Sequence, residues 1–410
     1  MAGLEAGQGR FTVLGMIRAL VVAVALGAAA IFGLSLSGEG SSKRGAEISD
    51  DEVVARLATG PMTQFAGLAP LLIAARAKPD DLEAARAAAS ALIDAGRKAG
   101  NSRLVGAALG VLRPFLAKDP APETLRLAAE ARQYQHDFTG ALALLDRAIT
   151  LDPALLDAIL MRATIQVVVG NLAKAQEDCL SLRDQRPDIA FLCQSTALTL
   201  TATAPEVYKR LEGLTASDKL NPALKEWALS LMGEIAMLQG NTEPAKAHFQ
   251  AVLADNPFAL RERLILADLM LKEGASQEVT DLLKDAPPVD GVLIRRALAA
   301  RASGDTTAAQ QAQDEVAARV RQNLQLGLKA HAREDAMYFL WLAGDPAQAL
   351  ERAKVNWTMQ HEIDDARLLI AAADAAGQTA EAIPVLAWMK AQAIVVPTLT
   401  LPASISALAK

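Results

Sequence analysis

A short phrase that begins with glycine recurs along the chain at irregular intervals of about 34 residues, a spacing typical of helical repeat proteins. The first gap, from Gly170 to Gly240, spans about two such intervals and contains one degenerate repeat. The six copies are GNLAKA at Gly170, GNTEPA at Gly240, GASQEV at Gly274, GDTTAA at Gly304, GDPAQA at Gly344 and GQTAEA at Gly377. Glycine tolerates the left-handed backbone that often ends a helix, and an adjacent Asn, Asp, Ser or Thr can cap the next one. The sixth residue is small in every copy except the one with Val279, and a small residue lets two helices approach closely. The phrase therefore predicts a helix–turn–helix hairpin repeated many times.

The composition agrees with a purely helical repeat. Hydrophobic residues make up 52% of the 410 residues but aromatic residues only 4%, so alanine and leucine supply much of the apolar content. These residues favour helices, and runs of strand-forming residues are few. Prolines at Pro153, Pro187 and Pro257 stop the second helix of several hairpins, and the first two are separated by one repeat interval. We therefore expect an all-α fold that forms one elongated domain rather than two compact ones.

The hairpin that starts near Glu226 carries the most specific pattern. Its spaced residues are Gly233, Ala245, Phe249, Val252 and Pro257. In this pattern the sequence resembles the tetratricopeptide repeat family, and a second hairpin fits through Ala141, Leu145, Ala148 and Pro153. Most of the hairpins lack the Trp and Tyr that the family places in its first helix. The resemblance implies a right-handed α-solenoid of stacked antiparallel hairpins whose first helices line a concave, partner-binding side.

The composition and the repeats divide the chain into five segments. We expect a short cytoplasmic N-terminus with a membrane or signal helix in 1–38, and a flexible linker in 39–50. Residues 51–120 supply capping helices and a degenerate hairpin, 121–390 the tetratricopeptide-like repeats, and 391–410 an extended tail with two prolines.

The N-terminal apolar stretch suggests a compartment. Residues 19–38 contain no charged side chain, and about 20 apolar residues are what a helix needs to cross a bilayer. Two interpretations remain open: a single-pass anchor in a bacterial inner membrane with the repeats in the periplasm, or a cleaved signal that leaves a periplasmic or secreted protein. Met16, as an alternative start, would favour the cleaved signal.

Placing the family's groove positions on this chain predicts which residues face a partner. In four hairpins these positions are Glu123, Arg126, Leu127 and Glu130; Asp157, Leu160, Met161 and Thr164; Trp227, Ser230, Leu231 and Glu234; and Arg261, Leu264, Ile265 and Asp268. They lack the Lys and Asn cluster of chaperone-binding members. An apolar stripe bordered by acids is expected instead, formed by Met161, Leu231, Met237, Ile265 and Leu271. This stripe would suit an unknown protein or peptide partner with a basic amphipathic segment, unless a shifted register makes it ordinary core between hairpins.

The two cysteines are placed symmetrically about a predicted turn. Cys179 and Cys193 lie equally far from Arg186 on either side, so antiparallel helices would bring them to the same level. In an oxidising compartment they could form a disulfide, which would stabilise the fold by about 3 kcal/mol. The alternative is a pair of small, buried, reduced side chains.

Several function classes are disfavoured. A formal net charge of −6 argues against nucleic-acid binding, and two cysteines with four scattered histidines offer little for a metal site. No nucleophile, zinc-protease, phosphate-loop or dinucleotide motif is found, so neither enzyme activity nor a cofactor is expected.

The expected function is a membrane-anchored extracytoplasmic scaffold for protein–protein interaction. Family members with one N-terminal membrane segment suggest settings in cell-envelope assembly, secretion or maturation of another protein. A small-ligand binder or enzyme that uses the concavity, and a purely structural spacer, are the alternatives.

Overall fold

The computed structural model describes residues 67–117, 120–217 and 220–409. These residues form helices joined by short turns, and no strand occurs among them. The predicted membrane or signal helix, the linker and residues 51–66 of the capping segment lie outside the described residues. Within the described ranges, no helix is both long and apolar enough to span a bilayer.

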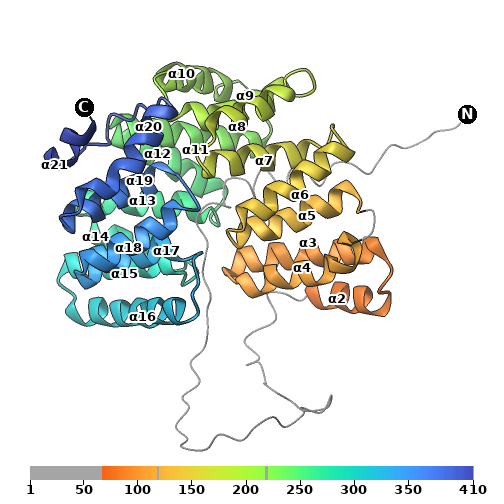
Figure 1. Ribbon diagram of the computed structural model, residues 1–410, viewed down its shortest axis with the longest axis horizontal. Helices are drawn as coiled ribbons and strands as arrows, with labels where there is room; N and C mark the ends of the chain where they lie inside the picture. Colours follow the sequence, from red (N-terminus) through yellow and green to blue (C-terminus); the bar gives the residue numbers. More distant parts are fainter. Residues whose placement is uncertain (1–66, 118–119, 218–219, 410) are drawn as a thin grey trace, which may run out of the picture.

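The helices follow one another as antiparallel hairpins (Figure 1). Their bounds are α2 Leu68–Ala77, α3 Leu82–Ala99, α4 Ser102–Leu116, α5 Pro122–Tyr134, α6 Phe138–Leu151, α7 Leu156–Val168, α8 Leu172–Ser181, α9 Pro187–Leu198, α10 Ala204–Thr215, α11 Pro222–Gln239, α12 Thr242–Asp255, α13 Leu260–Lys272, α14 Ser276–Leu283, α15 Asp290–Ser303, α16 Thr306–Gln325, α17 Ala332–Met337, α18 Pro346–Trp357, α19 Ile363–Ala375, α20 Ile383–Ala391 and α21 Ala403–Ser406. Three short segments adjoin these helices: the π-helix η2 Tyr338–Ala343 follows α17, the 3₁₀-helix η3 Thr379–Ala382 precedes α20, and the 3₁₀-helix η4 Ala407–Ala409 follows α21.

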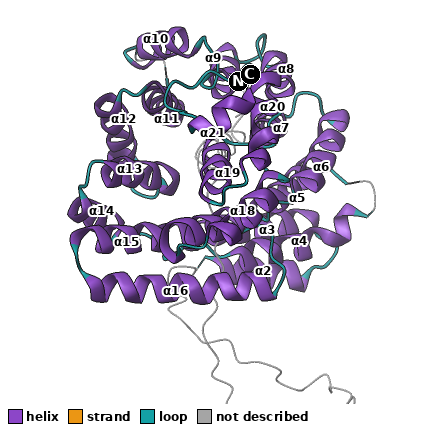
Figure 2. Ribbon diagram, turned by 60° about the vertical axis from the view of Figure 1, so that its left-hand side comes forward, coloured by secondary structure: helices purple, strands orange, loops and turns teal. Residues whose placement is uncertain are grey.

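From α3 onward the odd-numbered helices are the first members of the hairpins and the even-numbered helices the second, with η2 extending α17. Successive hairpins stack into a curved α-solenoid, and Figure 2 shows that the helices follow one another around a ring. The all-α solenoid predicted from the sequence is therefore confirmed. The first helices contact one another along the series α5, α7, α9 and α11 and along the series α13, α15, α17 and α19. Side chains from the first helices α7 to α19 line the concave side.

All six glycines of the repeated phrase have the left-handed backbone that the sequence predicts. Their φ angles lie between 66° and 88°. The capping part of the prediction holds only in some copies. Asp305 and Asp345 accept hydrogen bonds from backbone amides of the following helix. Asn171 does not cap, because its side chain donates to Gln166 instead, and Asn241 forms no side-chain cap either.

A further copy of the phrase begins with histidine instead of glycine. His136 lies one repeat interval before Gly170 and takes up the same left-handed backbone, with a φ angle of 60°. The amide of Asp137 donates to the carbonyl of Arg132 at 2.9 Å, which closes the end of α5 as glycine does in the other copies. A search for glycine alone misses this copy.

Gly233 and Phe249 explain why the hairpin of α11 and α12 follows the family pattern so closely. A Cβ atom on Gly233 would lie 2.7 Å from the ring of Phe249, and that ring is fully buried. Only glycine allows the aromatic side chain of α12 to press against the backbone of α11. The register inferred from the sequence is correct in this hairpin.

The solenoid also closes on itself. Residues after α18 reach back to the C-terminal ends of α7, α9 and α11, and one hydrophobic cluster contains side chains from both sides, including Leu200, Leu238 and Trp388. The His361 amide donates to the carbonyl of Val168 at 2.7 Å. We call this contact between distant hairpins the seam.

The C-terminal segment supplies the rest of the seam. It leaves α20, runs in extended form past the ends of α9 and α11, and ends in the short helix α21. The tail predicted over 391–410 therefore contains a short helix as well as extended chain, and it lies against hairpins distant in sequence as well as the last one.

Candidate functional site

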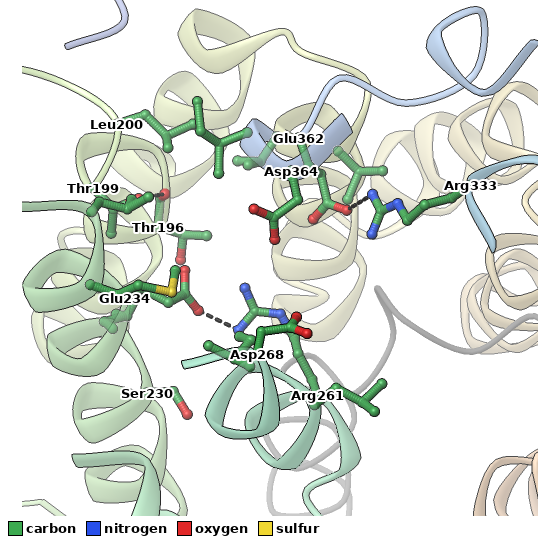
Figure 3. A pocket seen from close by; sticks show the side chains of 18 of the residues that line it. Thr196, Thr199, Leu200, Ser230, Glu234, Arg261, Asp268, Arg333, Glu362 and Asp364 are labelled. Atoms are coloured by element: carbon green, nitrogen blue, oxygen red, sulfur yellow. Dashed lines mark hydrogen bonds and ion pairs between the residues drawn. The ribbon is translucent and has the colours of Figure 1, made fainter. Parts of the chain in front are cut away.

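The concave side of the solenoid encloses one chamber lined by the first helices of consecutive hairpins. Figure 3 shows side chains from these helices converging on it. The lining residues are Thr164, Val167, Val168, Thr196, Thr199, Leu200, Trp227, Ser230, Leu231, Glu234, Met237, Leu238, Arg261, Leu264, Ile265, Asp268, Gly291, Arg295, Arg333, Glu334, Met337, His361, Glu362, Ile363 and Asp364. They come from the first helices α7 to α19 and from the ends of those helices.

Two hairpins place their groove positions as the family pattern requires. All four positions of α11 and all four of α13 line the chamber: Trp227, Ser230, Leu231, Glu234, Arg261, Leu264, Ile265 and Asp268. In α7 only Thr164 does so, and in α5 none of the four lines it. The register inferred from the sequence therefore locates the chamber well in α11 and α13 and poorly nearer the N-terminus.

The predicted apolar stripe is divided between the chamber and the core. Leu231, Met237 and Ile265 line the chamber. Met161 is buried in a cluster with neighbouring hairpin residues, and Leu271 packs against another cluster, so neither reaches the chamber. The structure brings together three of the five residues.

Arginine–carboxylate pairs link successive first helices across the chamber. Arg261 of α13 pairs with Glu234 of α11. Arg295 of α15 pairs with Asp268 of α13 at 2.5 Å, through the same positions one repeat interval later. The sequence analysis identified Glu234, Arg261 and Asp268 but missed Arg295, although the repeated spacing of both partners would have revealed it.

Arg333 extends this series from the start of α17. It pairs with Glu362 and, at 2.6 Å, with Asp365 at the start of α19. Asp365 and Glu362 also form a reciprocal cap on α19. Asp364, between these two capping residues, turns into the chamber (Figure 3).

The chamber is acidic on balance. Five carboxylates line it against three guanidinium groups. Each guanidinium already pairs with a carboxylate, whereas no side chain in the described part of the chain forms an ion pair with Glu334. A ligand that enters the chamber therefore meets more negative than positive charge.

Burial raises the pKa values of two acids of the chamber, Glu334 in the first turn of α17 and Glu362 directly before α19. It raises the pKa of Glu334 to about 7, although Arg333 and His331 oppose the rise. Burial likewise raises the pKa of Glu362 to about 7, with Arg333 opposing it and Asp365 adding to it. Acids with such raised pKa values inside a cleft are typical of binding sites, because a positively charged ligand can restore their ionisation.

Glu262 lies just behind the chamber wall. Its side chain is fully buried, and one oxygen accepts a hydrogen bond from Ser230 at 3.0 Å while the other has no partner in the described residues. Burial raises the pKa of Glu262 to about 7 despite the nearby Arg261. The wall therefore holds an acid that is costly to ionise.

The two cysteines lie away from the chamber. Cys179 of α8 and Cys193 of α9 form a disulfide with Cα atoms 5.4 Å apart, and both side chains are buried in the core between hairpins. The symmetric placement about the turn at Arg186 produces this proximity.

The histidines do not gather into a site. His248 hydrogen-bonds Tyr208 at 2.9 Å, and His361 packs edge-on against Trp357. No group of three or more His, Cys, Asp or Glu side chains within the described ranges is arranged to hold a metal ion.

No family profile and no curated protein sequence matches the chain. Among solved structures, it resembles the APC/C Cut9–Hcn1 hetero-tetramer at 14% identity and a TM-score of 0.47, covering 83% of this chain but only 64% of the other. It also resembles a Rap protein complexed with competence and sporulation factor, at 13% identity and a TM-score of 0.45, covering 77% of this chain and 98% of the other. A tetratricopeptide repeat protein from Parabacteroides merdae shows 13% identity, a TM-score of 0.36 and coverages of 71% and 98%.

At these identities and scores the likeness concerns helical architecture alone. The hairpins, the glycine turns and the Gly233–Phe249 contact define the class directly, as an α-solenoid of tetratricopeptide-like repeats.

Proposed function

We propose that this protein is a scaffold that binds a segment of another protein in its acidic chamber. The observation that carries the proposal is that all eight groove positions of α11 and α13 line one chamber. Four of the eight are apolar and four are polar or charged, a mixture that suits an amphipathic helix or an extended peptide.

The charge of the chamber favours a partner segment with a basic side chain. Glu334 has no ion-pair partner among the described residues. Asp364 already pairs with Arg367 at 2.9 Å, but its side chain is 57% exposed and can be reached by a partner. A lysine or arginine of the partner would pair with these acids. Burial of Glu334 costs stability in the free protein, so a binding role accounts for this acid better than a purely structural role.

Photo-crosslinking tests this function. A photoreactive residue at Ile265, inside the chamber, should capture a protein from intact membranes, and the same residue at the exposed position Gln310 on the outer helix α16 should not. Substitution Asp364→Lys in the Ile265 probe should weaken capture. Equal capture at both positions, or no capture at Ile265, contradicts the proposal.

We further propose that the repeats act outside the cytoplasm, held by residues 19–38 as a membrane anchor. The disulfide between Cys179 and Cys193 supports this, because disulfides persist in oxidising compartments. The apolar length of residues 19–38 supports the anchor. Cell-envelope assembly, secretion and protein maturation are the settings in which such a scaffold would act.

Fractionation tests the location. The native protein should remain with the membrane after a high-salt wash and should be digested by protease added outside the inner membrane. Release by salt, or resistance to protease until the membrane is broken, would exclude this arrangement.

The acidic lining of the chamber favours a second candidate, a small cationic ligand. The raised pKa values of Glu334 and Glu362 are what an ammonium or guanidinium ligand would reverse. Native mass spectrometry of gently purified protein would reveal a bound small molecule. A bound mass together with no crosslinked protein at Ile265 would favour this candidate over the scaffold.

A further inference from the structure

The closed seam raises the question of how a partner segment would enter the chamber. Residues 392–401, which we call the C-terminal strap, lie against the ends of α9 and α11. The Val395 amide donates to the carbonyl of Leu200 at 2.8 Å, and the Thr398 amide donates to the carbonyl of Leu238 at 3.3 Å. Because Leu200 and Leu238 also line the chamber, the strap covers the outside of the wall whose inside they form.

Few interactions hold the strap to these distant helices. Besides the two amides, the Thr398 hydroxyl donates to the Leu238 carbonyl at 3.0 Å, and the Gln392 side chain accepts from the Leu172 amide at 3.1 Å. Ile394 and Val396 are buried at the seam, and Leu399 and Leu401 are partly buried against the same cluster. A segment without internal helical hydrogen bonds and with so few anchors belongs to the less stable parts of a fold, which open before the rest.

The strap has a strained hinge and a stiff body. Ala393 adopts a left-handed backbone with a φ angle of 51°, a conformation that favours glycine. Pro397 within the strap and Pro402 directly after it restrict the chain to extended conformations. Strain at one end and stiffness beyond it favour release of the strap as a unit rather than by gradual fraying.

We propose that the C-terminal strap is a gate, and that its release from α9 and α11 opens the wall of the chamber and admits the partner. The gate itself is a property of the chain alone; its role in admitting a partner rests on the proposed scaffold function. The Thr398 hydroxyl also accepts a hydrogen bond from Arg367 of α19 at 2.8 Å, so the strap in its closed position is tied to both sides of the seam.

The test measures access to the chamber without any partner. The substitution Met237→Cys places a thiol on the chamber lining. Both native cysteines are bonded to each other, so the new thiol has no competitor. Its rate of reaction with a bulky maleimide reports how often the wall opens, and Ser303→Cys, on an exposed helix end, reports the intrinsic reactivity.

Two matched pairs of substitutions loosen the strap. Val395→Pro removes the amide that binds Leu200, whereas Val395→Ala keeps it and changes only a side chain that is 46% exposed. Thr398→Val removes the hydroxyl with little change of shape, whereas Thr398→Ser keeps it. Val395→Pro should speed labelling of Met237→Cys about fivefold, the effect expected from losing one hydrogen bond. Thr398→Val should speed it at least as much, because the hydroxyl makes two hydrogen bonds, to Leu238 and from Arg367. The second member of each pair should leave the rate nearly unchanged.

A third thiol separates opening of the strap from unfolding of the chain. Ala129→Cys lies in a fully buried position of α5, far from the seam in sequence. Its labelling should stay slow in every strap variant. The gate is overturned if Met237→Cys reacts at the same rate in all variants, or if Ala129→Cys accelerates as much as Met237→Cys does.

The partner experiment then separates the two proposals. Crosslinking from Ile265 should rise in Val395→Pro if the strap limits entry. Absence of crosslinking in both the parent and Val395→Pro contradicts the scaffold function, while unchanged thiol labelling contradicts the gate.

Discussion

The indole nitrogen of Trp388 donates a hydrogen bond to the carbonyl oxygen of Gly170 at 3.2 Å, across 218 residues of sequence. The same glycine belongs to the repeated phrase and ends α7 in the left-handed conformation. A Cβ atom at this position would lie 2.6 Å from the Trp388 indole nitrogen and 2.8 Å from the Cβ of His361. Glycine is therefore needed at position 170 for two reasons. It allows the left-handed backbone of the hairpin turn, and it lets Trp388 and His361 pack closely against that turn.

Comparing two glycines separates these purposes. Gly274 has nearly the same φ angle, 78° against 81°, but a Cβ atom there would meet nothing within 4 Å. Both Gly170→Ala and Gly274→Ala strain the turn, and only Gly170→Ala also crowds the seam. Gly170→Ala should lower the free energy of unfolding by about 1–3 kcal/mol more than Gly274→Ala, the usual cost of overpacking. Chemical denaturation measures both; equal losses would mean that the seam contributes no stability.

The Gly233–Phe249 contact gives a second comparison. Gly233→Ala should destabilise by about 1–3 kcal/mol, because the new methyl group would lie against a fully buried ring. Gly213 in α10 has open space around it, so Gly213→Ala should be neutral or stabilising by up to about 1 kcal/mol through helix propensity. Thermal unfolding of the two variants checks the prediction. A Gly233→Ala protein as stable as the parent would show that the hairpin packs differently.

The Cys179–Cys193 disulfide closes an interval of 14 residues. Replacing both cysteines with alanine should lower the free energy of unfolding by about 3 kcal/mol, mainly by freeing the unfolded chain. Reduction of the parent should have a similar effect, and protein purified without reductant should contain no free thiol. Two titratable thiols in that protein would rule out the bond.

Glu262 gives a prediction about pH. Its folded pKa of about 7 lies above the ordinary value of 4.5, so the folded state binds this proton more tightly than the unfolded chain does. The carboxyl group therefore costs no stability below pH 4.5, and its cost grows as the pH rises from 4.5 to 7.

The neutral substitution Glu262→Gln should remove this pH-dependent cost. At pH 8 the variant should be more stable than the parent by about 1–3 kcal/mol, since each unit of pKa shift is worth about 1.4 kcal/mol. The advantage should vanish near pH 4. Urea unfolding at both pH values measures it. A constant difference between parent and variant would show that Glu262 does not titrate near neutrality.

The sequence predicts the repeated hairpins well because the residues that define each hairpin lie close together along the chain. The glycine that ends each first helix and the close Gly233–Phe249 contact depend on residues within one hairpin, so the repeat period reveals them. The groove positions of α11 and α13 follow from the same register.

The seam could not be predicted in the same way. It depends on how far the solenoid turns between Gly170 and Trp388, which is the sum of small rotations at many hairpin contacts. Asp364 and Arg333 reach the chamber only because of that turn, so no local pattern marks them. Arg295 is different, since its position one repeat interval after Arg261 was available in the sequence.

Hydrogen exchange at single amides shows whether the solenoid closes on itself at the seam. Three amides in the described part of the chain donate to backbone carbonyls across the seam: His361 to Val168, Val395 to Leu200 and Thr398 to Leu238. All three should exchange much more slowly than unstructured amides in the parent protein, and Gly170→Ala should reduce the protection of His361 while helix α12 keeps its own. Exchange of these three amides at the unprotected rate in the parent would contradict the closed form.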